Sequence, residues 1–217
     1  MPPYAYNPPD VPLSILHHDS ALLIVDKPAG LLSVPGKDPG KEDCLIDRLR
    51  RVFPEVLLVH RLDCDTSGVM VFALTKAVQG NLGQQFEKRQ TKKIYVARLA
   101  GRLEPKEGTV DLPLCVDWPN RPRQHVNHEI GKPAITDYRV VRYDGNTTRV
   151  RLMPQTGRSH QLRVHMLELG HPILGDQIYA EGADRDAHPR MMLHAESLRL
   201  RHPETGKSVT FSAPAPF

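Results

Sequence analysis

The hydrophobic pattern of this chain has mainly the period of β-strands. Residues 21–25 and 69–74 are apolar without alternation, which is typical of strands that are buried on both faces. Other segments alternate between apolar and polar residues, as strands with one wetter face do. These alternating segments are residues 94–100, 136–141, 149–153 and 193–201.

Fewer segments have a helical pattern. Residues 45–53 have a short apolar stripe, residues 75–90 follow the capping residue Thr75, and residues 156–170 end at a glycine. Predicted strands therefore outnumber predicted helices, and the two do not alternate one for one. We expect an α+β fold with one large, mixed but mostly antiparallel sheet and flanking helices.

The chain has no evident linker, so residues 1–217 are predicted to form a single domain. Residues 1–12 contain five prolines and are expected to form an extended N-terminal arm. Prolines and charges make residues 101–133 resemble a long irregular connection, and such loops are often functional.

Composition favours a folded cytoplasmic protein. Hydrophobic residues make up 40% of the 217 residues and charged residues 25%, and no apolar run approaches the roughly 20 residues of a membrane helix. The N-terminus lacks the pattern of a secretory signal. The three cysteines are far apart in sequence, which argues against a disulfide framework and a structural zinc site.

The positive charge is concentrated in the later part of the chain. Residues 1–60 contain 6 Lys/Arg and 8 Asp/Glu, whereas residues 61–217 contain 23 and 17. Such a local excess is typical of proteins with a polyanionic partner, although many basic enzymes have none.

Residues 60–68 are the densest polar segment, between two apolar ones. They include His60, Arg61, Asp63 and Asp65, and residues 66–68 supply turn chemistry directly after Asp63. We expect this loop to lie at the mouth of the sheet. The alternative is a polar hairpin loop with solvated charges.

Arg163 stands out within the predicted helix at 156–170. It falls on or beside the apolar stripe of Leu162, Met166 and Leu169. A buried arginine needs an anionic partner, and the loop at 60–68 offers two carboxylates. Alternatively, Arg163 extends along the apolar surface to solvent.

Two basic segments are candidate RNA contacts. Residues 88–93 contain four Lys/Arg, Lys92 and Lys93 among them, and lead into a strand with Tyr95; Arg121 and Arg123 lie in the long connection. Basic charge beside an aromatic ring can bind phosphate and stack a base. A charge run alone is more often a solvated surface, and a lone tyrosine is more often part of a core.

The usual metal and cofactor motifs are absent from the sequence. His160 and His165 are five residues apart and would face different sides of a helix, and there is no His-Glu-x-x-His motif. Glycine-rich nucleotide motifs and the Gly-x-Ser-x-Gly elbow are also missing. We expect no metal and no cofactor.

Several motifs together resemble the RluA family of RNA pseudouridine synthases. The resemblance runs the length of the chain, with the motifs in the family's order. These motifs are residues 25–31, His-Arg-Leu-Asp at 60–63 with Thr-Ser-Gly-Val at 66–69, and residues 92–97, 156–165, 170–176 and 192–195. Residues 111–114 and 117–122 resemble the member that modifies both 23S ribosomal RNA and tRNA, and no S4-like RNA-binding domain precedes them.

The resemblance implies a role for each matching residue. It makes Asp63 the catalytic carboxylate, paired with Arg163, and it places Tyr95 against the target base as the candidate for handling the C5 proton. It gives Arg61 the task of holding the RNA open and gives Leu193 a place in the apolar pocket. The further expected RNA contacts are His60, Lys92, Lys93, Arg121, Arg123 and Arg158.

The predicted function is therefore isomerisation of uridines in structured RNA, by a monomer without membrane attachment. One alternative is a non-catalytic RNA-binding or ribosome-assembly protein. Another is a glycoside hydrolase that uses Asp63 and Asp65 as its carboxylate pair, although residues two apart in a tight loop seldom flank one bond.

Overall fold

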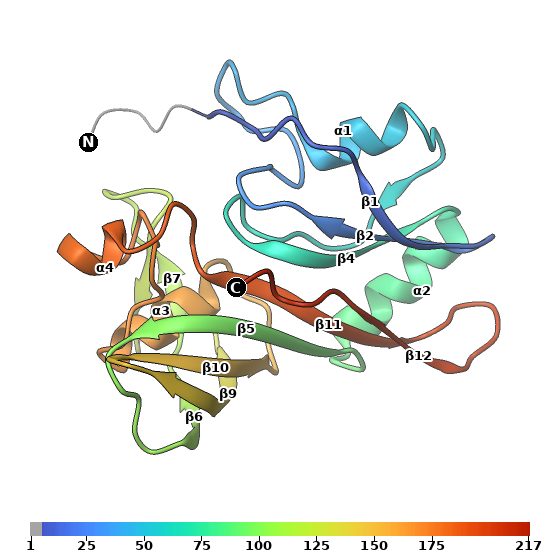
Figure 1. Cartoon of the computed structure of the whole chain (residues 1–217). Helices are drawn as coiled ribbons and strands as arrows, with labels where there is room; N and C mark the ends of the chain where they lie inside the picture. The colour runs from blue at the N-terminus through green and yellow to red at the C-terminus, as the bar shows by residue number, and fades with distance from the viewer. Residues whose placement is uncertain (1–5) are drawn as a thin grey trace. The chain divides into compact units, whose positions relative to one another are not determined.

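The computed structural model describes residues 6–217, so residues 1–5 of the predicted arm lie outside the described part. Residues 6–13 of the chain have no regular secondary structure. Contacts divide the chain into two compact units, whose relative positions are not determined. Unit 1 holds the described residues up to Lys92 together with Ala195–Pro216, and unit 2 holds Lys93–His194 and Phe217 (Figure 1).

Unit 1 is built mainly on antiparallel strand pairs. Their bounds are β1 (Ser14–His18), β2 (Leu22–Lys27), β3 (Leu57–Leu58), β4 (Ser67–Ala73), most of β11 (Leu193–Arg201), and β12 (Ser208–Ser212). The strand order is β1-β2-β4-β11, with β3 also paired to β4 and β12 to β11. The pairings of β1 with β2, β2 with β4, β3 with β4 and β11 with β12 are all antiparallel.

All seven residues of β4 are buried, which explains the apolar run without alternation in this part of the sequence.

Helix α2 (Lys76–Glu87) begins at the predicted cap, where Thr75 Oγ1 accepts the N–H of Val78. Val78 and Leu82 pack α2 onto the strands. Helix α1 (Leu45–Arg50) confirms the short helix predicted at residues 45–53.

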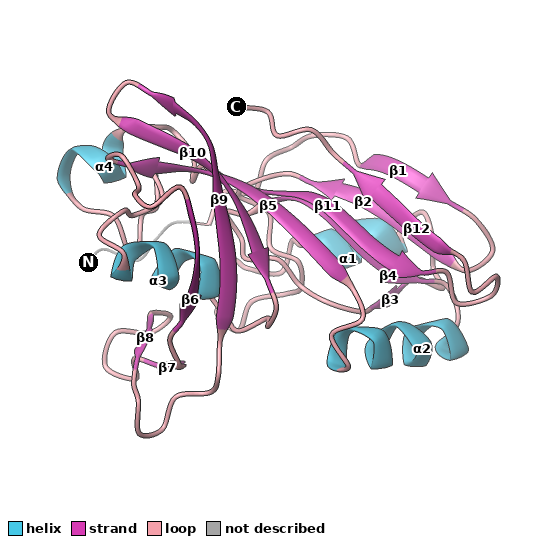
Figure 2. Cartoon of the chain, turned by 90° about the horizontal axis from the view of Figure 1, so that it is seen from below, coloured by secondary structure: helices cyan, strands magenta, loops and turns pink. Residues whose placement is uncertain are grey.

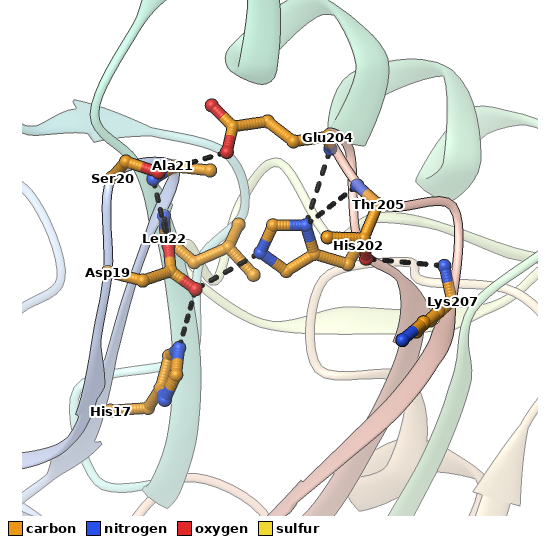
Figure 3. Close-up of polar contacts among 9 residues, drawn as sticks. All are labelled: His17, Asp19, Ser20, Ala21, Leu22, His202, Glu204, Thr205 and Lys207. Carbon is orange, nitrogen blue, oxygen red and sulfur yellow. Dashed lines mark hydrogen bonds and ion pairs between the residues drawn. The ribbon is translucent and has the colours of Figure 1, made fainter.

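A polar cluster joins the β1–β2 turn to the β11–β12 turn in unit 1 (Figure 3). Asp19 Oδ2 accepts hydrogen bonds from Nε2 of His17, at 2.7 Å, and of His202, at 3.0 Å. Asp19 Oδ1 accepts the N–H groups of Ala21 and Leu22. Burial raises the pKa of Asp19, but these four hydrogen bonds outweigh it and hold the pKa well below its usual range.

Unit 2 contains a second antiparallel set of strands, in the order β5-β10-β9-β6, and a separate β7–β8 hairpin. Their bounds are β5 (Lys92–Ala100), β6 (Glu107–Asp111), β7 (Leu114–Val116), β8 (Gln124–Val126), β9 (Ile135–Asp144) and β10 (Thr147–Pro154). Helix α3 (Gln161–Glu168) contributes Leu162 and Met166 to the core of this unit, and α4 (Gly182–Asp186) is a short exposed helix (Figure 2). The predicted α+β class with mostly antiparallel strands is thus confirmed.

Two expectations about local structure were wrong. Residues 101–133 are not wholly irregular, since they contain β6 and the β7–β8 hairpin. The helix predicted from residue 156 begins only at Gln161, because His160 has a left-handed φ of 55°. Thr156 does not cap it; its hydroxyl donates to Gln161 Oε1, at 2.7 Å.

The described residues, 6–217, contain no helix long and apolar enough to cross a membrane. None of the cysteines in this part of the chain forms a disulfide.

Candidate active site

The loop between β3 and β4 holds Asp63 in a fixed backbone. Leu62 is held by Ser33, whose Oγ donates to the Leu62 carbonyl at 2.7 Å and accepts the Leu62 N–H. The Asp63 carbonyl accepts the N–H of Thr66 and closes a turn. Asp63 itself is half-buried. The loop therefore holds a half-buried carboxylate on a backbone that is anchored on both sides.

A buried lysine anchors the other end of this loop. Lys27, at the end of β2, has no exposed surface, and its Nζ donates to the carbonyls of Pro28, Leu31 and Cys64 at 2.6–2.9 Å. The Cys64 carbonyl also accepts the N–H of Gly30. Because Cys64 follows Asp63, these bonds fix the backbone next to the predicted catalytic carboxylate. In the sequence, Lys27 stands out only as part of the family-like motif at residues 25–31.

The two residues of the His-Arg-Leu-Asp motif that were expected to contact RNA differ in their surroundings. Arg61 is exposed and available to a ligand. His60 is half-buried: its Nε2 accepts the N–H of Val71 at 3.1 Å, and its ring stacks on Phe86. His60 thus supports β4, and its contact with RNA stays a prediction.

In unit 2, Arg163 is buried and bound to a carboxylate, as its helical position required. Its Nε and Nη2 donate to the two carboxylate oxygens of Asp176, at 2.7 and 2.6 Å. The side chains are 3% and 0% exposed, so the alternative in which Arg163 extends to solvent was wrong. The pairing of Arg163 with Asp63, which belongs to unit 1, stays a prediction.

Asp176 is a functional candidate that sequence reasoning missed as the partner of Arg163. Burial raises its pKa, but the hydrogen bonds and charge of Arg163, with the N–H groups of Ile178 and Tyr179, outweigh this and lower it. Asp176 is therefore ionised at neutral pH. No periodicity marks it; the only signal was its place in the family-like motif at residues 170–176.

Tyr179 connects this ion pair to its surroundings. The guanidinium of Arg163 lies 5.0 Å from the centre of its ring. Burial raises the pKa of Tyr179 to about 12, so its hydroxyl stays protonated. That hydroxyl accepts the N–H of Gln124 and lies 2.7 Å from Nδ1 of His160, to which it can donate.

Tyr95 and Leu193 both contribute to the core of unit 2. Tyr95 is half-buried on β5, opposite Leu152 of β10, and packs against the core. Leu193, the first residue of β11, is 3% exposed and belongs to the same apolar cluster. Both positions are compatible with an apolar pocket wall, and their contact with a base stays a prediction.

The predicted basic contacts are divided between exposed and anchored side chains. Lys92, Arg121 and Arg158 are exposed. Lys93 Nζ donates to the carbonyl of Thr156, and Arg158 Nε to that of Pro133, both at 3.1 Å. Arg123 is half-buried and donates to the carbonyl of Ile178. Arg158 is anchored through Nε alone, so its other guanidinium donors are available to a phosphate.

Within residues 6–217 no three His, Cys, Asp or Glu side chains are grouped so that they could hold a metal ion.

Comparison with solved structures identifies the fold. The structure of human RNA pseudouridylate synthase domain containing 1 superposes with a TM-score of 0.79 and 34% sequence identity. The match covers 100% of this chain and 87% of the human one. The human RNA pseudouridylate synthase domain containing 4 gives a TM-score of 0.76 over 94% of this chain and 88% of its own, with 28% identity. The fold is that of pseudouridine synthases.

Sequence comparison narrows the class. Residues 21–168, which extend over both units, match the family model described as RNA pseudouridylate synthase. The dual-specificity RNA pseudouridine synthase RluA of Escherichia coli is 56% identical over 98% of both chains. The protein of that name from Yersinia pestis is 51% identical over 94% of this chain and 99% of its own.

The chain therefore belongs to the RluA family of RNA pseudouridine synthases, and its activity is the isomerisation of uridine to pseudouridine in RNA. The predicted function is confirmed at this level, and a non-catalytic binding protein or a glycoside hydrolase is disfavoured.

Proposed function

We propose that this enzyme modifies uridines in two classes of RNA, 23S ribosomal RNA and tRNA stem-loops, with Asp63 as its catalytic carboxylate. The names of its relatives include the words dual-specificity, which supports more than one kind of substrate. The observation that carries the catalytic part is the anchored loop. The backbone carbonyls of Leu62, Asp63 and Cys64 all accept hydrogen bonds, and Asp63 itself is half-buried.

The reaction needs one ionised carboxylate at a fixed position. The N1–C1′ bond of uridine breaks, the base rotates, a C5–C1′ bond forms, and the C5 proton is released while N1 gains one. An aspartate can assist as a nucleophile at the sugar or as a general base. Asp63 serves in either case, and the anchored backbone holds it in place for the reacting atoms. Since the product is an isomer of the substrate, the net reaction consumes no redox equivalent, and we propose that no metal or cofactor takes part.

The target uridine must leave its base stack before the chemistry begins. Unstacking costs a few kcal/mol, least in the loops of a folded RNA. We propose that Arg61, exposed and two residues before Asp63, holds the RNA open where the uridine has left. Tyr95 packs against the flipped base and handles the C5 proton, and Leu193 contributes to the pocket wall.

Phosphate contacts offset the cost of flipping. We assign them to Lys92, Lys93, Arg121, Arg123 and Arg158, whose charges lie on or near the surface of the protein. Each phosphate contact releases counterions from the RNA, so binding weakens as salt rises. We further propose that both units form one catalytic domain, as the extent of the family match suggests, and that the enzyme is a cytoplasmic monomer.

Release of tritium from RNA labelled at uridine C5 tests this function. The two substrates, unmodified tRNA and 23S ribosomal RNA, are assayed separately, with EDTA and without added cofactor. Release from both is the expected result. Release from only one removes the dual specificity, and release from neither refutes the assigned substrates.

A further inference from the structure

The β7–β8 hairpin presents the one tryptophan of the chain to solvent. Trp118 is 68% exposed, although a tryptophan gains more free energy from burial than most side chains. The guanidinium carbon of Arg121 lies 3.3 Å from the centre of its ring. This contact holds one face of the indole by a cation–π interaction, and the larger part of the side chain stays accessible.

The segment that carries this pair has a defined conformation. The N–H of Asp117 bonds to the carbonyl of Arg123, and the N–H of Arg123 to that of Asn120. The carboxylate of Asp117 accepts the side-chain amide of Asn120 at 2.9 and 3.1 Å. Because the loop is closed by these bonds, Trp118 is preorganised and a ligand need not order it.

The base of the hairpin rests on the scaffold that holds Arg163. Leu114 and Val126, from the two strands, pack in one cluster with Val164 of α3. Figure 2 shows the hairpin beside α3. Arg123 makes a second contact between the hairpin and this scaffold: it donates to the carbonyl of Ile178, and its guanidinium lies 5.0 Å from the centre of the Tyr179 ring. Tyr179 is also the ring against which Arg163 lies, so the hairpin and Arg163 share one support.

The hairpin that carries Trp118 has more basic than acidic side chains. Arg121, Arg123 and His125 belong to the hairpin, and Lys132 pairs with Leu114 through its backbone. Among the acidic residues nearby, Asp117 is hydrogen-bonded to Asn120 and Glu129 is exposed. An accessible aromatic ring within positive charge is the combination that binds single-stranded nucleic acid, where bases stack on rings and cations contact phosphates.

We propose that Trp118 and Arg121 form a stacking platform for an unpaired base of the substrate RNA other than the target uridine. The inference rests on the proposed function and extends it, since it assigns a recognition element outside the residues given to the chemistry. The free face of the indole stacks on the base and Arg121 supports the other face. Arg123, whose backbone bonds to Asp117 and Asn120 on either side of Trp118, is assigned to the adjoining phosphate. Stacking is tolerant of base identity, so the platform recognises an unstacked loop nucleotide and not a sequence.

Because Trp118 is the only tryptophan, its fluorescence tests the proposal directly. The full chain is titrated with an unmodified tRNA transcript, and the indole emission is recorded. We expect saturable quenching as the base stacks. In parallel, W118A is expected to bind the same transcript about 5- to 150-fold more weakly and to release tritium correspondingly more slowly at low RNA concentration. W118F, which keeps an aromatic face, recovers most of that loss.

The matched control is V52A. Val52 is 62% exposed in unit 1 and belongs to no proposed RNA contact, so V52A keeps wild-type binding and turnover. Wild-type RNA affinity in W118A, or emission that RNA does not change, overturns the platform. Emission that changes with protein concentration but not with RNA assigns the surface to self-association and also overturns it. If the wild-type enzyme releases no tritium, the proposed substrates fail, while quenching by RNA still decides the platform.

Discussion

Replacing Asp176 with asparagine removes one charge from the buried pair that it forms with Arg163 of α3. The shape of the side chain is conserved, but Arg163 loses the carboxylate that both Nε and Nη2 contact, at 2.7 and 2.6 Å. The side chains are 3% and 0% exposed, so water cannot replace the lost interaction. Removing one partner of such a pair costs about 3–5 kcal/mol.

That cost corresponds to a fall in Tm of about 6–20 °C for a chain of this size. Its pH dependence has a definite sign. The folded pKa of Asp176 is lowered, so the ionised carboxylate contributes stability at neutral pH that is lost as the pH falls through the folded pKa. The difference between wild type and D176N is therefore greatest near pH 7 and shrinks in acid.

Thermal unfolding followed by circular dichroism measures this effect. The control is D144N, which removes the same charge from an exposed pair, since the Arg142 and Asp144 side chains are 58% and 32% exposed. Exposed pairs contribute about 0–1 kcal/mol, so D144N keeps a Tm close to that of wild type. If D176N and D144N lowered the Tm equally, the assigned importance of the buried pair would be refuted.

Three other substitutions test separate parts of the fold. D19N removes the acceptor shared by two histidines and lowers the free energy of unfolding by about 1–2 kcal/mol at pH 7. This difference from wild type narrows in strong acid, because the folded pKa of Asp19 is lowered. Urea unfolding across pH measures the difference, and a value unchanged down to pH ~2 would contradict the assigned ionisation. G68A destabilises the fold by about 3 kcal/mol or more, because a Cβ at this position would lie 2.3 Å from the Ala195 carbonyl oxygen and the backbone φ is 117°. A Tm equal to that of wild type would show that β4 and β11 can move apart to accommodate the methyl group. K27M removes the donor to three carbonyls around the Asp63 loop. It lowers kcat by up to about 100-fold, measured at a temperature where circular dichroism shows that the variant is folded. An unchanged kcat would show that Lys27 does not position Asp63.

The regular strands could be predicted from the sequence because their pattern matches their burial. The apolar run at residues 69–74 overlaps β4, whose residues are all buried. The alternating run at residues 193–201 coincides with β11, in which residues 198–201 alternate between buried and exposed. Thr75 was also a reliable helix start, since its hydroxyl accepts a backbone N–H as a cap should.

The start of α3 could not be predicted in the same way. Thr156 looks like a cap, but its hydroxyl donates to the side chain of Gln161, and the left-handed φ of His160 delays the helix. That conformation depends on tertiary contacts, such as the hydrogen bond between His160 and Tyr179, which no local pattern reveals. The β7–β8 hairpin was missed because its strands have only three residues each.

The candidate site was predictable in its residue types but not in all its partners. The helical position of Arg163 correctly required a buried carboxylate, yet Asp176 lies 13 residues further on, in a segment with no regular secondary structure. Burial of Lys27 was equally hidden, because a lysine before a Pro-Ala-Gly turn looks solvent-exposed until its three carbonyl partners are seen. Such pairings arise from contacts between residues far apart in the sequence, so they cannot be predicted from a local pattern.

The central claim is that Asp63 performs the chemistry, and the most direct test is D63N assayed for tritium release and for RNA binding in the same preparation. The control is D38N, in which the replaced carboxylate is 70% exposed in unit 1 and only pairs with Lys41. We predict that D63N binds the RNA but releases no tritium, while D38N is as active as wild type. Substantial tritium release by folded D63N would contradict the account.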